Sequence, residues 1–351
     1  MSALNQLPPD LIEAILPFLP PKSLGRFKSV SKRWYSLISS LNFIKTHIRN
    51  YTKNNPNPKP TQLILLPGYG DDNSLYSVDI KQLNTQTTPA TVTAKRLNLQ
   101  EQWAMILGSC NGILLALDHI ALDHLALDEH HNLYLVNPTT KKTLKVPDSG
   151  EESHASYGFG YDASTDDYKV ISISRMSNSD SDANCVSISV YSLRNNLWRK
   201  LPNSLFQQDD FCCLPPGVFV NNNLHWVVRS RHSTLTIATF SLATEEFCEI
   251  DLPYSVNFDG QYCFNLFAFG GKLVAVLYDE LHFAGNFSEM WVMGKYGVHE
   301  SWMKYCIFED EMDTCFTVLT QISNWDILLR NRDVSDLFIY SMDERMQKCN
   351  N

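Results

Sequence analysis

The sequence predicts a small all-α N-terminal module of three helices, followed by an all-β, propeller-like body with six blades. Three observations support this prediction. In the first 48 residues, apolar positions recur at helical spacing and prolines interrupt them. From residue 61 onwards, short β-rich runs alternate with turn clusters, and no segment has long helical periodicity. These runs repeat with a period of about 50 residues, which is typical of propellers.

Length and composition bound the class of protein. The chain has 351 residues, of which 44% are hydrophobic and 19% charged, so we expect two globular units and no wholesale disorder. The longest apolar stretches are about 13 residues, whereas a membrane-spanning helix needs about 20. The N-terminus is polar and resembles no secretory signal. The nine cysteines include no C-x-x-C pair, which favours reduced thiols. We therefore expect an intracellular protein of the cytoplasm, the nucleus or both.

The charge is unevenly distributed along the chain. Residues 1–60 contain nine Lys and Arg against two Asp and Glu, whereas residues 61–351 contain twenty against thirty-six. A basic module therefore precedes an acidic body. The module suits nucleic acid or an acidic protein, and the acidic body weakly favours a target of basic character.

Three short helices are expected in the module. Pro8-Pro9-Asp10 suits a first helical turn, since proline is tolerated there and Asp10 faces the positive end of the helix dipole. The apolar positions of the first helix are Leu11, Ile12, Ile15, Leu16 and Leu19. A second helix is expected at residues 23–27, with Leu24 and Phe27. A third is expected at residues 30–38, with Val30, Trp34, Leu37 and Ile38.

A module of this size cannot bury all these apolar side chains by itself. Some of them must form an exposed face, which either docks on the body or awaits a partner.

Residues 4–48 resemble an F-box. The matching residues are Leu7-Pro8-Pro9-Asp10-Leu11-Ile12, Ile15-Leu16, Leu19-Pro20-Pro21-Lys22-Ser23-Leu24, Arg26-Phe27-Lys28-Ser29-Val30-Ser31-Lys32-Arg33-Trp34 and Leu37-Ile38. The resemblance implies binding to a Skp1-type adaptor and, through it, to the cullin and RING subunits of an SCF ubiquitin ligase. It implies no nucleic acid and no membrane. The implied adaptor contacts are Leu7, Pro8, Leu11, Ile12, Ile15, Leu16, Leu19, Pro20, Leu24, Phe27, Val30, Trp34, Leu37 and Ile38.

Two residues depart from the F-box pattern. Ser31 stands where relatives often have Cys, and Gly25 lies inside the second helix. Glycine there costs about 1 kcal/mol of helix propensity. We expect both departures to be tolerated.

Residues 49–60 are expected to be a linker, because they contain three prolines and several asparagines. The body then extends over residues 61–348.

The repeat in the body is visible at strand ends, where an apolar residue precedes a small or turn-prone one. The markers that fit this pattern are Tyr76-Ser77, Val136-Asn137, Tyr191-Ser192, Phe240-Ser241 and Tyr340-Ser341, and Trp291-Val292 fills the gap between the last two. Six markers predict six blades, and five or seven stay open because the end units are weakest.

The long first spacing contains three near-copies of Ala-Leu-Asp-His in residues 116–130. His and Asp are suitable metal ligands, but a five-residue period points them in different directions, so we expect a solvated insertion and no metal.

The body resembles the F-box-associated domain of plant F-box proteins, including the S-locus F-box-like and defence-related groups. The matching residues are Ser109-Cys110-Asn111-Gly112-Ile113-Leu114, Asn137-Pro138-Thr139-Thr140-Lys141, Tyr157-Gly158-Phe159-Gly160-Tyr161-Asp162, Asp166-Asp167-Tyr168-Lys169-Val170, Leu224-His225-Trp226 and Ser301-Trp302. The resemblance implies a propeller-like domain that recognises a target protein. Aromatic residues in four turn-rich segments are candidate contacts. They are Phe206, Phe211, Tyr254, Phe258 and Phe283.

No catalytic signature is present in the sequence. There is no G-x-S-x-G, Walker loop or H-E-x-x-H motif. The run Gly158-Phe159-Gly160 indicates a close approach of the backbone, and acidic pairs such as Asp166-Asp167 indicate solvated turns. We therefore expect a non-catalytic receptor without a cofactor. The alternatives are a propeller enzyme or lectin with a helical arm, and an F-box protein that sequesters a partner.

Overall fold

A computed structural model gives the structure of the protein. It describes residues 9–40, 43–44, 46–47, 50, 62–66, 73–80, 93–118, 132–150, 155–175, 186–202, 215–229, 234–253, 262–279, 287–305, 316–321, 326–331 and 337–341. The chain divides into two compact units, Met1–Lys59 and Pro60–Asn351.

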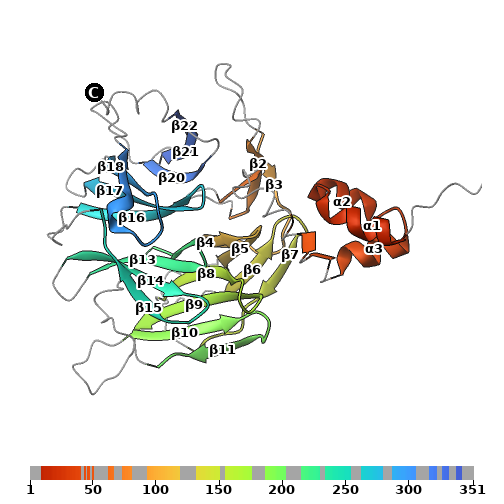
Figure 1. Cartoon of the computed structure of the whole chain (residues 1–351), viewed down its shortest axis with the longest axis horizontal. Helices are drawn as coiled ribbons and strands as arrows, with labels where there is room; N and C mark the ends of the chain where they lie inside the picture. The colour runs from red at the N-terminus through yellow and green to blue at the C-terminus, as the bar shows by residue number, and fades with distance from the viewer. Residues whose placement is uncertain are drawn as a thin grey trace, which may run out of the picture. The chain divides into compact units, whose positions relative to one another are not determined.

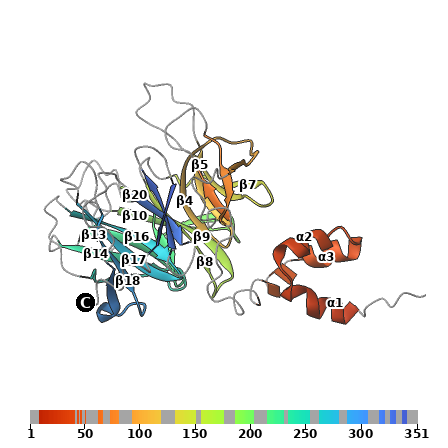
Figure 2. The same ribbon diagram turned by 90° about the horizontal axis from the view of Figure 1, so that it is seen from above.

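The first unit contains the three predicted helices, which form one small bundle (Figures 1 and 2). They are α1 (Pro9–Ile15), which continues into the 3₁₀ turn η1 (Leu16–Phe18), α2 (Pro21–Phe27) and α3 (Lys32–Ser39). Helix α3 begins two residues later than predicted. The reason is that Ser31 caps it, accepting a 3.2 Å hydrogen bond from the backbone N–H of Trp34.

The core of the helical module is small. Leu16, Leu24, Ile38 and Phe43 are buried, and the Phe27 and Trp34 rings pack against them. These two rings meet edge to face at 5.5 Å. Among the described helices none is long and apolar enough to span a membrane.

The second unit is an all-β propeller whose described strands form six antiparallel sheets. The first contains β1 (Gln62–Leu65), β2 (Tyr76–Asp79) and β3 (Lys95–Arg96), and the second β4 (Trp103–Cys110), β5 (Ile113–Asp118), β6 (Leu133–Asn137) and β7 (Lys142–Lys145). The third contains β8 (Ser156–Asp162), β9 (Asp167–Arg175), β10 (Val186–Ser192) and β11 (Leu197–Lys200), and the fourth β12 (Val218–Val220), β13 (Asn223–Arg229), β14 (Leu235–Ser241) and β15 (Phe247–Ile250). The fifth contains β16 (Tyr262–Phe269), β17 (Lys272–Asp279), β18 (Phe287–Met293) and β19 (Trp302–Tyr305), and the last β20 (Phe316–Gln321), β21 (Asp326–Asn331) and β22 (Leu337–Ser341).

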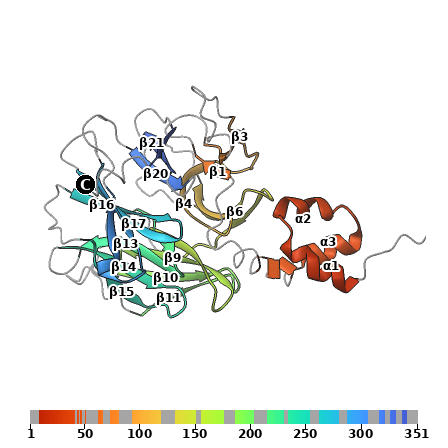
Figure 3. The same ribbon diagram turned by 45° about the horizontal axis from the view of Figure 1, so that its top comes forward.

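The sheets follow one another around a common centre in chain order (Figures 1 and 3). Strands β4, β8, β12, β16 and β20, the first of their sheets, contact one another in that order. A parallel bridge joins Gly158 on β8 to Gly217, just before β12. Four sheets have four strands, as a propeller blade does, whereas the first and the last have three described strands each.

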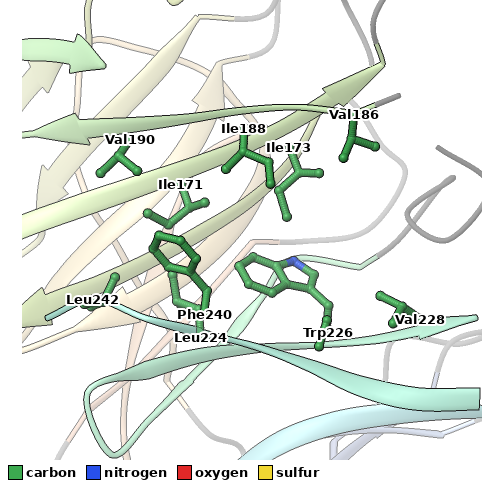
Figure 4. Packing of buried hydrophobic residues seen from close by; sticks show 11 residues of the cluster. Ile171, Ile173, Val186, Ile188, Val190, Leu224, Trp226, Val228, Phe240 and Leu242 are labelled. Carbon is green, nitrogen blue, oxygen red and sulfur yellow. The ribbon is translucent and has the colours of Figure 1, made fainter. Parts of the chain in front are cut away.

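The core lies between successive sheets. Between the third and fourth sheets, isoleucines and valines of β9 and β10 face Leu224, Trp226 and Phe240 (Figure 4). This packing confirms the predicted close approach at the glycine run, because a Cβ on Gly158 would lie 2.7 Å from the Trp226 ring.

Four of the six repeat markers mark equivalent places in the fold. Val136, Tyr191, Phe240 and Tyr340 are each the last residue but one of the third strand of their sheet. The other two markers are wrong. Tyr76 begins β2 instead of ending a strand, and Trp291 lies two residues before Met293, the last residue of β18. The tandem copies within residues 119–131 lie outside the described residues.

Candidate functional site

An exposed apolar stripe covers one side of the first helix. Leu11 and Ile15, one helical turn apart on α1, are 48% and 50% exposed, and Phe18 on η1 is 64% exposed. Residues spaced i, i+4 and i+7 share one helical face. Leu11 and Ile15 were among the predicted adaptor contacts, whereas Phe18 was not. Phe18 could have been found from the sequence, because it continues the helical spacing of Leu11 and Ile15 beyond Pro17.

Helix α3 and the segment that leads into it add a second exposed apolar pair. Val30 and Tyr35 are 59% and 60% exposed, and the ammonium group of Lys28 lies 5.9 Å from the centre of the Tyr35 ring. The neighbouring Lys32 and Arg33 are also exposed. Apolar and cationic side chains therefore occur together here, which suits an acidic partner with an apolar surface. Tyr35 was not among the predicted contacts.

The other predicted contacts lie deeper. Leu16, Leu24 and Ile38 are buried in the core of the module. They can therefore support an adaptor surface only by holding the exposed residues of the helices in place. Five more pack against that core and are partly exposed, and Pro20 is exposed. These five are Ile12, Leu19, Phe27, Trp34 and Leu37. Leu7 and Pro8 lie outside the described residues.

The propeller has tight turns on one face. Three of them are two-residue hairpins in which both residues have positive φ: Asn111-Gly112, Asn221-Asn222 and Gly270-Gly271. These turns join the first and second strands of their sheets. Because neighbouring strands are antiparallel, the turns between third and fourth strands, such as 193–196, lie on the same face.

Longer connections join the strand ends of the opposite face. They link second to third strands and one sheet to the next, for example residues 201–217 between β11 and β12. The predicted target contacts Phe206, Phe211, Tyr254, Phe258 and Phe283 belong to such connections and lie outside the described residues. Their role in target binding stays a prediction.

A buried ion network joins the third and fourth sheets. The ammonium group of Lys169 on β9 donates to Asp162 at 2.9 Å, to the backbone oxygen of Leu242 at 2.6 Å and to Glu245 at 3.0 Å. Arg199 on β11 also pairs with Glu245. Asp162 is fully buried. Burial alone would raise its pKa, but hydrogen bonds from Ser164, Thr165 and Lys169 hold the pKa well below its ordinary value.

The other acidic residues of this turn also have partners inside the protein. Asp166 accepts a 2.5 Å hydrogen bond from the Tyr161 hydroxyl, and Asp167 accepts from the Ser192 hydroxyl and from the backbone N–H of Arg194. The expectation of solvated turns is therefore wrong here, because these carboxylates hold the turn together.

A buried histidine joins the fourth and fifth sheets. His225 Nδ1 lies 2.9 Å from the backbone oxygen of Val218, which can only accept, so Nδ1 carries the proton. Nε2 then accepts from the Tyr296 hydroxyl at 2.8 Å. Burial lowers the pKa of His225 to about 4 and raises the pKa of Tyr296 to about 12. Both groups are thus neutral at pH 7 and act as a structural pair.

The described part of the chain brings no catalytic set together. Within it, no three metal-ligating side chains cluster. Burial raises the pKa of the Cys110 thiol to about 12, which removes its nucleophilic form at pH 7. Among the described residues, the pairs Lys169–Glu245 and His225–Tyr296 each join one sheet to the next, so they hold the propeller together.

Comparisons with known proteins match both units. A family model described as the F-box domain matches residues 4–46, and one described as the F-box associated beta propeller domain matches residues 70–348. An F-box/kelch-repeat protein of Arabidopsis thaliana is 30% identical over 311 residues, which cover 86% of this chain and 79% of that protein. The F-box protein CPR1 of the same plant is 28% identical over 324 residues, covering 85% of this chain and 72% of that protein.

Proposed function

Because the chain belongs to the plant F-box proteins that have an F-box associated beta propeller domain, we propose that it is the substrate-recognition subunit of an SCF ubiquitin ligase. The F-box binds a Skp1-type adaptor, and cullin and RING subunits join through that adaptor. The propeller holds a target protein, and its proximity to the ubiquitin-charged enzyme leads to ubiquitination. The subunit itself performs no chemistry.

The exposed apolar stripe is the observation that supports this proposal most directly. Leu11, Ile15 and Phe18 are 48–64% exposed on a module with little core of its own. An apolar surface of this kind on a small unit marks a protein interface. The basic residues beside Val30 and Tyr35 favour an acidic partner over a neutral one.

The six sheets of the second unit are proposed to be six blades. Four sheets have the full four strands, and the three-stranded first and last sheets count as the remaining two blades. In this arrangement the longer connections emerge together on one face, where a target protein would contact several blades at once. Phe206, Phe211, Tyr254, Phe258 and Phe283 remain the proposed target contacts.

Reconstitution tests the proposal. Purified full-length chain, mixed with a Skp1-type adaptor and cullin, should elute as one complex in size-exclusion chromatography. The substitution Ile15→Lys should prevent the complex, because it puts a charge into the apolar interface, whereas Glu13→Lys on the same helix should preserve it. Glu13 is exposed and outside the stripe. A folded wild type that never joins the complex would contradict the proposal and favour a propeller enzyme or lectin with a helical arm.

Target turnover separates the receptor from an F-box protein that only sequesters its partner. A receptor shortens the half-life of its target in cells, and the Ile15→Lys variant restores that half-life. Sequestration leaves the half-life unchanged in both cases.

A further inference from the structure

A run of basic side chains lies on the outer strands of three consecutive sheets. Strand β3, strand β7 with its preceding turn, and strand β11 with its preceding turn contain eight Lys and Arg and no Asp or Glu. We call this surface the basic rim. Its residues are Lys95, Arg96, Lys141, Lys142, Lys145, Arg194, Arg199 and Lys200, and all eight are exposed. In the body these eight are a large share of only twenty cations.

The three parts of the rim adjoin one another. Thr143 on β7 donates a 2.8 Å hydrogen bond to Glu101, five residues beyond the end of β3. On the other side of β7, the indole N–H of Trp198 on β11 donates to the backbone oxygen of Pro147 at 2.7 Å. In Figure 1, β3 and β7 lie on the right of the propeller and β11 lies along its lower edge. Hydrogen bonds therefore link the three parts of the rim at two points.

Few acidic groups in the described part of the chain face the rim. Glu101 already accepts from Thr143, Asp148 accepts from the backbone N–H of Gly150, and Glu245 pairs with Lys169 and Arg199. The two lysines of β7, together with Lys95 and Lys141, supply most of the charge. The local surface is thus strongly positive although the body as a whole is acidic.

Protection of sheet edges does not account for the rim. Lysine on an edge strand commonly prevents unwanted strand pairing, and this explanation would apply to every outer strand. Strand β15 has no Lys or Arg and contains Glu249, and the only cation of β19, Lys304, pairs with Glu289. Strand β22, the outer described strand of the last sheet, has no Lys or Arg either, so the positive charge is confined to three of the six described outer strands.

We propose that the basic rim binds an extended acidic segment of a target protein that also presents apolar side chains. This inference rests on the proposed receptor function and names the chemistry of the partner. Leu144 and Leu197, which are 46% and 65% exposed, alternate with the cations of β7 and β11. Mixed apolar and basic strands fit a protein segment better than a nucleic acid, which favours stacking aromatic residues. This proposal differs from the expectation of a basic target that followed from overall charge.

Fluorescence anisotropy tests the proposal with full-length chain and a labelled peptide that repeats Glu-Glu-Leu. The rim variant is Lys142→Glu with Lys145→Glu. The control variant is Lys272→Glu with Lys295→Glu, which makes the same change of charge at the first residue of β17 and in the turn after β18. All four side chains are exposed, so both variants should fold, and their thermal melting is measured in parallel.

The wild type should bind the peptide in a salt-dependent manner, and the rim variant should bind on the order of tenfold more weakly. The control variant should bind as the wild type does. A peptide that repeats Gln-Gln-Leu should bind none of them.

Equal weakening in both variants, or no binding by the wild type, would overturn the proposal. Tighter binding of a single-stranded oligonucleotide of equal charge would overturn it in favour of nucleic acid. Adaptor binding is measured on the same samples. A rim variant that binds adaptor but not peptide supports both proposals, whereas a wild type that binds peptide but not adaptor contradicts only the receptor function.

Discussion

Replacing Lys169 by Met should destabilise the propeller strongly. The substitution keeps the length and apolar stem of the side chain but removes three hydrogen bonds of 2.6–3.0 Å. Asp162, which is fully buried, then loses its only cationic partner among the described residues. Breaking a buried ion pair by removing one partner costs about 3–5 kcal/mol.

The lower end of that range applies here. Asp162 keeps its hydrogen bonds from Ser164 and Thr165, and Glu245 keeps Arg199. We therefore expect a loss of about 3 kcal/mol, which lowers the melting temperature of the propeller by roughly 5–10 °C. Calorimetry of the full-length chain measures this shift. Lys272→Met, at the exposed first residue of β17, is the control and should stay within about 0.5 kcal/mol of the wild type.

The dependence on pH provides a second test of the same network. In the wild type the pKa of Asp162 is lowered, so its stabilisation is present above the ordinary pKa of 3.8 and is lost as the pH falls through the folded value. Without Lys169 the pKa of Asp162 rises, so the carboxyl is protonated at a higher pH than in the wild type. The stability difference between Lys169→Met and the wild type should therefore shrink as the pH approaches 4. A melting temperature within a degree or two of the wild type at pH 7 would refute the buried network.

Three further predictions concern other parts of the fold. Gly25→Ala should stabilise the helical module by up to about 1 kcal/mol in a urea titration, because nothing lies within 4 Å of the added methyl group. Gly217→Ala should lower the melting temperature through a loss of roughly 1–3 kcal/mol, because its Cβ would lie 2.4 Å from the Trp226 ring; an unchanged melting temperature would contradict this packing. His225→Gln should flatten the pH dependence of stability between about 6.5 and 4: the neutral, buried imidazole stabilises the fold above pH 6.5, and this contribution declines as the pH falls towards 4. Equal slopes of the melting temperature against pH for the variant and the wild type would argue against a neutral His225.

The sequence predicted the helical module well because its signals are local. Prolines begin α1 and α2, and apolar spacing indicates which helical sides face inward. The same spacing could not divide buried from exposed positions. Leu11 and Leu16 lie on one side of the predicted helix, yet only Leu16 enters the core, because the chain changes to a 3₁₀ turn after Ile15.

The repeat of the body was predictable where the turn between third and fourth strands is short. It failed at β18, because the turn to β19 extends over residues 294–301 and includes the 3₁₀ turn η4 (His299–Ser301), which moves the marker to Met293. The ion network was hidden for a different reason. Lys169 and Glu245 are 76 residues apart, and only the packing of successive sheets brings them together.

The basic rim had a signal in the sequence that overall charge concealed. Its cations occur in groups of two or three, about one repeat length apart, at the outer strands of three consecutive sheets. Sorting the charges by their position within the repeat would have found the rim.

Titration of the full-length chain with a Skp1-type adaptor in a calorimeter tests the central claim most directly. The account predicts saturable one-to-one binding that Ile15→Lys abolishes and Glu13→Lys leaves intact. A folded wild type that gives no binding signal, or an Ile15→Lys variant that binds as tightly as the wild type, would contradict the assignment of this surface to the adaptor.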